Sequence, residues 1–89
     1  MSKAVADPEH LRAFAASLRR FNDDLQQQVS VLGAQMNQLN QTWRDEQQRK
    51  FADEFAESMR HLQRFMRAGQ DHVPYLLKKA DQIDAYLDR

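Results

Sequence analysis

The stretch Asn40-Gln41-Thr42-Trp43-Arg44-Asp45-Glu46-Gln47 lies at the middle of the 89-residue chain and contains its only tryptophan. Long segments with helix-like spacing of apolar residues lie on both sides of it, and the stretch itself has neither glycine nor proline. In one continuous helix an apolar residue should follow Trp43 near position 47, but that residue is Gln47. Residues 44–50 have no apolar side chain at all. The interruption predicts that the chain reverses direction at about residues 43–45.

A helix start just after the tryptophan supports this reversal. Asp45 is a suitable N-cap, because its carboxylate can accept a hydrogen bond from a free amide of the first turn. Glu46 then lies at the positive end of the helix dipole. Gln48 follows Asp45 by three residues, which is the spacing of a capping box. We therefore expect a tight turn followed at once by a second helix.

The first segment predicts one amphipathic helix over about residues 8–42. Asp7-Pro8-Glu9 is typical of a helix start, because Asp caps free amides and Pro is favoured at the first helical position. Apolar residues then recur every three or four positions, which is the spacing of one face of an α-helix. A helix of this length would extend about 50 Å. The recurring residues are Leu11, Phe14, Leu18, Phe21, Leu25, Val29, Leu32, Met36, Leu39 and Trp43.

The second segment predicts another amphipathic helix, over about residues 46–88. Pro74 falls inside it, and a proline removes one backbone hydrogen bond and clashes one turn back. We therefore expect a kink, or a short break near Gly69 to Val73. The apolar pattern stays in phase across the proline, which favours a bent helix. The pattern comprises Phe51, Phe55, Met59, Leu62, Met66, Gly69, Val73, Leu76, Ala80, Ile83 and Leu87.

The fold class follows from these two patterns. We expect an all-α protein, a single domain over residues 1–89, in which two long helices form an antiparallel hairpin. The apolar stripes are wider than one partner helix can cover, so we also expect two hairpins to pair into a four-helix bundle dimer. The predicted core or dimer-interface residues are Leu11, Phe14, Leu18, Phe21, Leu25, Leu32, Met36, Leu39, Phe51, Phe55, Met59, Leu62, Met66, Val73, Leu76 and Ile83.

Composition limits the classes of function. Thirteen basic and thirteen acidic residues cancel, and the arginines at 60, 64 and 67 are interleaved with Glu57 and His61, so we expect no nucleic-acid binding. The chain has no cysteine and therefore no disulfide or thiol chemistry. No apolar run approaches the roughly 20 residues that span a bilayer, and the sequence near Met1 lacks the apolar core of a secretory signal. We expect a cytoplasmic location before any export, and export without a cleaved signal peptide.

Candidate catalytic and metal-binding residues are weak. His61 and His72 would lie about 16 Å apart along a helix, too far to share a metal ion, and His10 is in the other helix. Asp53, Glu54 and Glu57 lie on the polar side, where nothing should raise a carboxyl pKa for acid–base work. Ser58 lies near His61, but a nucleophile also needs a pocket and an oxyanion site. We expect no enzyme activity, no metal and no cofactor.

Two charge patterns have open interpretations. The nineteen residues from Leu25 to Trp43 carry no formal charge. They are either a neutral solvated surface or a surface covered by a partner, because uncharged groups are easier to desolvate. The end of the second predicted helix has mixed charges, which we interpret as solvated helix-surface pairs worth tenths of a kcal/mol. Its charged residues are Lys78, Lys79, Asp81, Asp84, Asp88 and Arg89.

With its length, its two helices and its central tryptophan, the chain resembles the WXG100 family, the ESAT-6-like small proteins linked to type VII secretion. The family motif is Trp-x-Gly at the turn. Trp43 and Arg44 match its first two positions, and Asp45 stands where glycine is expected. Glycine allows a positive φ, whereas Asp is the better cap, so the turn geometry could differ. Secreted members often carry Tyr-x-x-x-Asp/Glu after the second helix, but Lys79 stands four residues after Tyr75, and that motif is expected to be missing.

The resemblance implies a dimer of hairpins, formed with itself or with a related small hairpin protein, and contact with secretion machinery. The residues Trp43, Arg44 and Asp45 are candidates for partner recognition. Alternatively, the Trp43 ring closes the end of the bundle over the last apolar residues of both arms. Our first hypothesis is a non-enzymatic secretion substrate, effector or component. The alternative is an intracellular helical adaptor or regulator without an export role, and a membrane-surface helix is disfavoured by the zero net charge.

Overall fold

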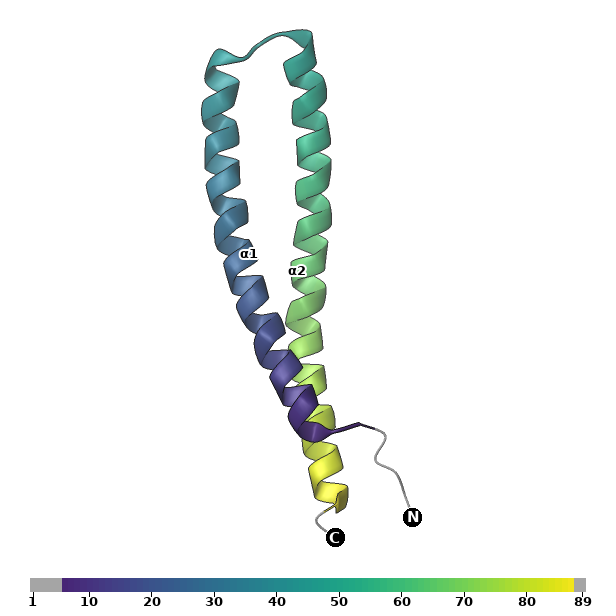
Figure 1. Cartoon of the computed structure of the whole chain (residues 1–89). Helices are drawn as coiled ribbons and strands as arrows, with labels where there is room; N and C mark the ends of the chain where they lie inside the picture. Colours follow the sequence, from purple (N-terminus) through teal and green to yellow (C-terminus); the bar gives the residue numbers. More distant parts are fainter. Residues whose placement is uncertain (1–5, 88–89) are drawn as a thin grey trace.

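The computed structural model describes residues 6–87 and has two long helices. Helix α1 is Pro8–Thr42 and helix α2 is Glu46–Leu87. They run antiparallel and are joined at one end by a short turn, so that the start of α1 and the end of α2 lie at the opposite end, here called the base (Figure 1). The molecule measures 67 × 18 × 15 Å. The expected all-α helical hairpin is confirmed, whereas the predictions for Asp88, Arg89 and the first five residues concern positions outside the described part.

Local capping determines where each helix begins. The Asp7 carboxylate accepts a hydrogen bond from the Glu9 amide at 2.9 Å, and Pro8 occupies the first turn of α1. The Asp45 carboxylate likewise accepts from the Gln48 amide at 2.9 Å, which confirms the predicted cap of α2. The reciprocal half of a capping box is not formed. The Gln48 side chain instead donates to Oδ1 of Asn40, across the turn.

Pro74 does not interrupt α2, which is helical from residue 46 to residue 87. Of the two outcomes expected at the proline, the short break is therefore wrong. A bent helix remains a prediction. The helix stays intact because Val73 and Ala80, before and after the proline, are both buried. Only the Gln70 carbonyl, one turn earlier, loses its usual helical donor.

Close packing is concentrated toward the base of the hairpin, where α1 begins and α2 ends. Every fully buried residue in the described part lies between positions 15 and 22 of α1 or between 66 and 80 of α2. Toward the turn the two ribbons lie farther apart (Figure 1), and no residue between positions 23 and 65 is buried. The helices are thus clamped at the base and loosely packed toward the turn. The buried residues are Ala15, Asn22, Met66, Gly69, Val73 and Ala80.

One close contact between the helices joins a polar side chain to a glycine. Asn22 is only 8% exposed, and its Nδ2 donates to the Met66 carbonyl at 3.0 Å. A Cβ added to Gly69 would lie 2.3 Å from that Nδ2, so only glycine allows the helices to approach this closely. The Oδ1 of Asn22 is buried without a hydrogen-bond partner in the described structure. A polar group held in this way fixes the register of α1 against α2.

The predicted apolar positions differ widely in burial. Only Met66 and Val73 are fully buried. Nine are half-buried, namely Leu11, Leu18, Leu25, Met36, Phe55, Met59, Leu62, Leu76 and Ile83. The remaining five are exposed, namely Phe14, Phe21, Leu32, Leu39 and Phe51. One hairpin therefore covers part of the apolar surface and leaves large side chains in contact with solvent.

The contact between Asn22 and Gly69 generates a double-mutant prediction. Gly69→Ala should lower the free energy of unfolding by about 1–3 kcal/mol, because the new methyl group clashes with the buried amide. In an Asn22→Ala background the same change should be neutral or stabilising by up to about 1 kcal/mol, since Ala favours helix and the obstructing amide is gone. Urea unfolding at one fixed protein concentration measures both values. Equal effects of Gly69→Ala in the two backgrounds would show that the clash is not the cause.

Candidate functional site

The most prominent surface feature is an apolar stripe on one side of the hairpin, here called the Phe face. It consists of Phe14, Phe21, Leu32 and Leu39 of α1 together with Phe51 and Phe65 of α2. These side chains are between 41% and 60% exposed. On α1 they recur in steps of seven or eleven residues, which keeps them on one side of a helix.

An aromatic contact joins the two helices on the Phe face. The rings of Phe21 and Phe65 meet edge to face, with their centroids 5.8 Å apart, although the residues remain 53% and 47% exposed. The exposed apolar side chains of α1 and α2 therefore meet at this pair of rings. Fully burying a side chain of this size is worth about 1.5–3 kcal/mol, so exposing these side chains to solvent leaves that free energy unrealised in the single hairpin.

The turn forms a second cluster around Trp43. This residue is half-buried, and its ring lies 5.7 Å from that of Phe51, centroid to centroid. Phe51 in turn stacks on Phe55 at 6.1 Å. The tryptophan thus ends a row of aromatic rings that runs down α2. Arg44 and Asp45 are exposed beside it.

The backbone of the turn needs no left-handed residue. Trp43 is extended, with φ −102° and ψ 110°, and its N–H donates to the Leu39 carbonyl at 2.9 Å. No residue in the described range 6–87 has a positive φ. Asp45 therefore fits this turn as the cap of α2, without the conformational freedom of a glycine.

At the base of the hairpin, ion pairs join the start of α1 to the end of α2. An Arg12 Nη2 donates to Asp81 at 2.8 Å and to Asp84 at 2.5 Å. The hydrogen bonds to Asp81 and then to Asp84 raise the pKa of the Arg12 guanidinium. The interpretation of the two aspartates as purely solvated surface charges is therefore incomplete, because they tie the last turns of α2 to the first turns of α1.

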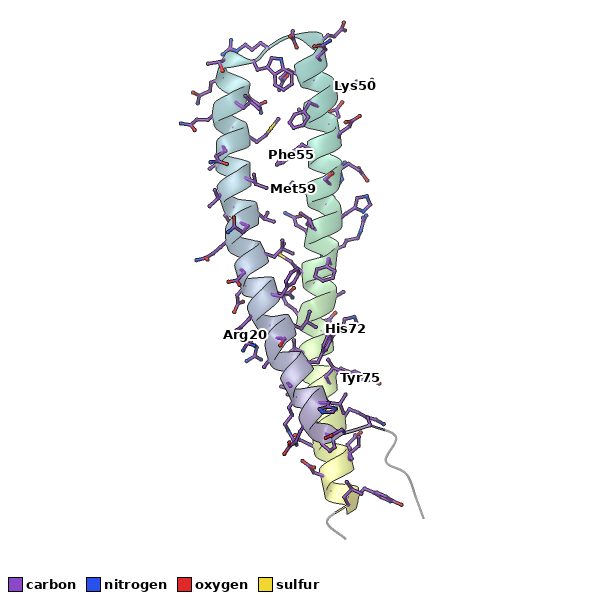
Figure 2. All side chains as sticks on the ribbon, viewed as in Figure 1. Arg20, Lys50, Phe55, Met59, His72 and Tyr75 are labelled. Atoms are coloured by element: carbon purple, nitrogen blue, oxygen red, sulfur yellow. The ribbon has the colours of Figure 1, made fainter. Side chains whose placement is uncertain are left out.

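The polar side of α2 has no arrangement suited to acid–base catalysis. Glu57 accepts a hydrogen bond from Arg60, which lowers the pKa of its carboxyl, whereas a general acid would need a raised value. The Nε2 of His61 lies 3.4 Å from Oε2 of Glu57, and its Nδ1 lies 2.6 Å from Nη2 of Arg64. All three side chains are exposed. Lys50, His72 and Tyr75 also point outward from α2 (Figure 2).

Within residues 6–87 no three His, Asp or Glu side chains come close enough together to hold a metal ion. Neither helix, over its described length, has an apolar stretch that could cross a bilayer.

Two residues of the hairpin interface escaped the sequence analysis. Asn22 and Ala15 are both buried, although neither belongs to the chosen apolar row. Ala15 and Asn22 begin a row with seven-residue spacing. Its later members, Val29, Met36 and Trp43, were already part of the predicted apolar pattern. This second row, and not the leucine row beside it, points most directly at α2. The Arg12 pairing was also missed, since no local spacing connects residues that are 69 and 72 positions apart.

Comparison with known proteins identifies the family. The family model "WXG100: Proteins of 100 residues with WXG" matches residues 5–85, which is most of the chain. The chain is a WXG100 protein. Members of this family are non-enzymatic helical hairpins, so the expectation that the chain is not an enzyme is confirmed by its family. No curated protein sequence matches it.

Solved structures of a secreted protein, EsxB from Bacillus anthracis str. Sterne, have the same fold as this WXG100 protein. The wild-type structure is 25% identical with a TM-score of 0.77, and a mutant is 24% identical with a TM-score of 0.78. Each match covers 93% of this chain and 89% of the other. The selenomethionine-labelled form matches with 24% identity and a TM-score of 0.75, over 97% of this chain and 98% of the other. The assignment of Asp45 to the family's glycine position remains a prediction.

The row of rings at the turn generates a prediction for Trp43. Trp43→Ala should lower the free energy of unfolding by about 2 kcal/mol, because it removes a half-buried ring from Phe51. Trp43→Phe, the matched control, should retain most of the stability. Chemical unfolding followed by circular dichroism measures both. A loss within about 0.5 kcal/mol for Trp43→Ala, together with lost binding to a partner, would make the ring a recognition residue.

The ion pairs of Arg12 generate a prediction about local order. Arg12→Gln should speed amide hydrogen exchange in residues 81–87 while leaving the turn unchanged, because the last turns of α2 lose their tie to α1. The difference should shrink near 1 M salt, where the Debye length is about 3 Å.

Arg20→Gln is the matched control, since Arg20 points away from α2 (Figure 2) and makes no ion pair within the described chain. If Arg12→Gln and Arg20→Gln affect residues 81–87 equally, the Arg12 pairs do not hold this end of the hairpin.

Proposed function

We propose that this WXG100 protein pairs through its Phe face with a second hairpin, either another copy of itself or a related small protein. The product is a four-helix bundle. The observation that carries this proposal is the continuous exposed surface around Phe21 and Phe65. Two helices in isolation have no further element to cover it, whereas a second hairpin offers an apolar face of matching length.

We further propose that the protein works with a type VII-like secretion system, as a substrate, effector or component. Family membership and the likeness to a secreted protein of Bacillus anthracis support this role. The turn residues Trp43, Arg44 and Asp45 are the candidates for contact with the secretion machinery, because an exposed charged pair flanks a partly exposed ring.

A second candidate function is an intracellular helical adaptor. It is favoured by one observation, the Lys79 that stands four residues after Tyr75, where the export motif of secreted relatives would have an acidic residue. Tyr75 is 64% exposed and points away from α1 (Figure 2), so it is accessible to another protein in either role.

The proposed pairing predicts a mutational effect on assembly. The double variant Phe14→Glu, Phe21→Glu should convert the assembled species to the monomer, because two charges would be buried at the interface. Val31→Glu is the matched control, since Val31 is an apolar α1 residue that is 52% exposed but lies off the Phe face. Sedimentation velocity measures the distribution of species. A double variant that assembles as well as Val31→Glu would exclude the Phe face as the interface.

The secretion role predicts dependence on the specialised ATPase of such a system. Tagged protein should appear in the culture medium of the parent strain and be retained in cells of a strain that lacks this ATPase. Undisturbed export without the ATPase, or no export under any condition, would rule out the secretion role and favour the adaptor.

A further inference from the structure

A groove runs along the side of the hairpin that carries no residue of the Phe face. It is a succession of hollows between α1 and α2, with volumes of about 160, 230, 340 and 510 Å³ from the base toward the turn. The α1 wall runs from Arg12 to Asn40 and the α2 wall from Ala52 to Leu77, and each wall includes a row of lining residues that recur in alternating steps of three and four. A regular row of this kind on each wall is the shape into which a third helix packs.

The hollow nearest the turn has the largest volume of the four, and small side chains line it on both walls. Gly33 and Ala34 of α1 and Ala52 and Ala56 of α2 line the largest hollow. A Cβ added to Gly33 would meet nothing within 4 Å, so α2 does not reach it. Phe55 and Met59 extend from α2 toward α1 (Figure 2), yet they remain half-buried and leave the hollow unfilled. Small residues on both walls would let another helix approach closely.

The α1 wall of this wide part is free of charge. It belongs to the uncharged stretch from Leu25 to Trp43, whose lining residues here include Ser30, Asn37 and Asn40. Covering neutral polar groups requires less desolvation than covering charges, and the amides can hydrogen-bond to an occupant. A solvated helix surface gives no reason for nineteen consecutive uncharged residues, whereas a covered one does.

The middle of the groove has an excess of positive charge. Arg19 lines it from α1 and Arg67 from α2, and neither makes an ion pair with any residue of the described chain. Asp23 is the one carboxylate among the residues that line the described hollows. Arg12, at the base, is already neutralised by Asp81 and Asp84. Carboxylates on an occupant would therefore find two free guanidinium groups, one on each wall.

We propose that this groove is a docking site for one amphipathic helix of another protein, whose contact side is small and uncharged and whose edges carry carboxylates. The site is separate from the Phe face, so the assembled bundle and the docked helix can exist together. Its specificity comes from Arg19 and Arg67 at mid-groove, and its close fit from the small residues near the turn.

The test uses the full chain and two synthetic helical peptides of about 18 residues, about 27 Å long. One has an alanine contact stripe flanked by glutamates, and the other has every glutamate replaced by glutamine. Fluorescence anisotropy should show at least tenfold tighter binding of the glutamate peptide, and this advantage should shrink with added salt. Amide shifts in NMR spectra should be confined to the residues of the two groove walls.

Variants distinguish this site from other modes of binding. Ala56→Leu fills the widest hollow and should weaken the glutamate peptide more than tenfold. The double variant Arg19→Gln, Arg67→Gln should abolish the advantage of glutamate over glutamine, while Arg20→Gln, which lies off the groove, should leave it intact. Circular dichroism confirms that each variant retains its helices.

Three results would overturn the proposal: no binding of either peptide, equal binding of the two, or tight binding that Ala56→Leu leaves unchanged. Pairing of the hairpins is measured separately, as the distribution of monomer and assembled species in sedimentation velocity of the same samples. Loss of assembly in the Phe14→Glu, Phe21→Glu variant with peptide binding retained would keep the two surfaces distinct. Loss of peptide binding in that variant would contradict their independence.

Discussion

Two packed helices can cover only the stripe of each helix that faces the other, and this constraint governs the whole molecule. In this chain α1 and α2 come close together where Asn22 packs against Gly69 and donates a hydrogen bond to the Met66 carbonyl. Aromatic side chains such as Phe21 and Phe65 lie just outside the stripe and touch each other in solvent. The single hairpin therefore has a polar contact that sets the register of its helices, and it leaves apolar surface exposed to solvent.

The same constraint gives the two sides of the hairpin different characters. One side carries the Phe face, which is large, apolar and continuous across both helices. The other carries the groove, which is lined by small residues, amides and two arginines that make no ion pair within residues 6–87. An interaction protein with no catalytic group needs differences of this kind, because its specificity depends on which surface meets which partner.

Much of the fold could be predicted from local chemistry. The Asp7 and Asp45 caps and the lack of an apolar residue at position 47 are short-range features, and the structure has the two helix starts and the turn that they predict. The burial of individual residues could not be predicted in the same way. The row through Ala15 and Asn22 faces α2 because of how two long helices lie against each other, and the pairing of Arg12 with Asp81 depends on the hairpin having closed. A local rule predicts a kink or a short break at Pro74, but α2 is continuous there, with Val73 and Ala80 buried on either side of the proline.

The central claim, that the Phe face is buried by a second hairpin, is tested most directly by the solution mass of the unmodified chain. Light scattering across a concentration series should show a stable species of twice the 10.5 kDa chain mass. A monomer that is partly unfolded or adhesive, and that becomes folded and dimeric when a related hairpin protein is added, would agree with a mixed bundle. A monomer that unfolds cooperatively, remains monomeric at the highest attainable concentration and has its Phe face in water would contradict the account.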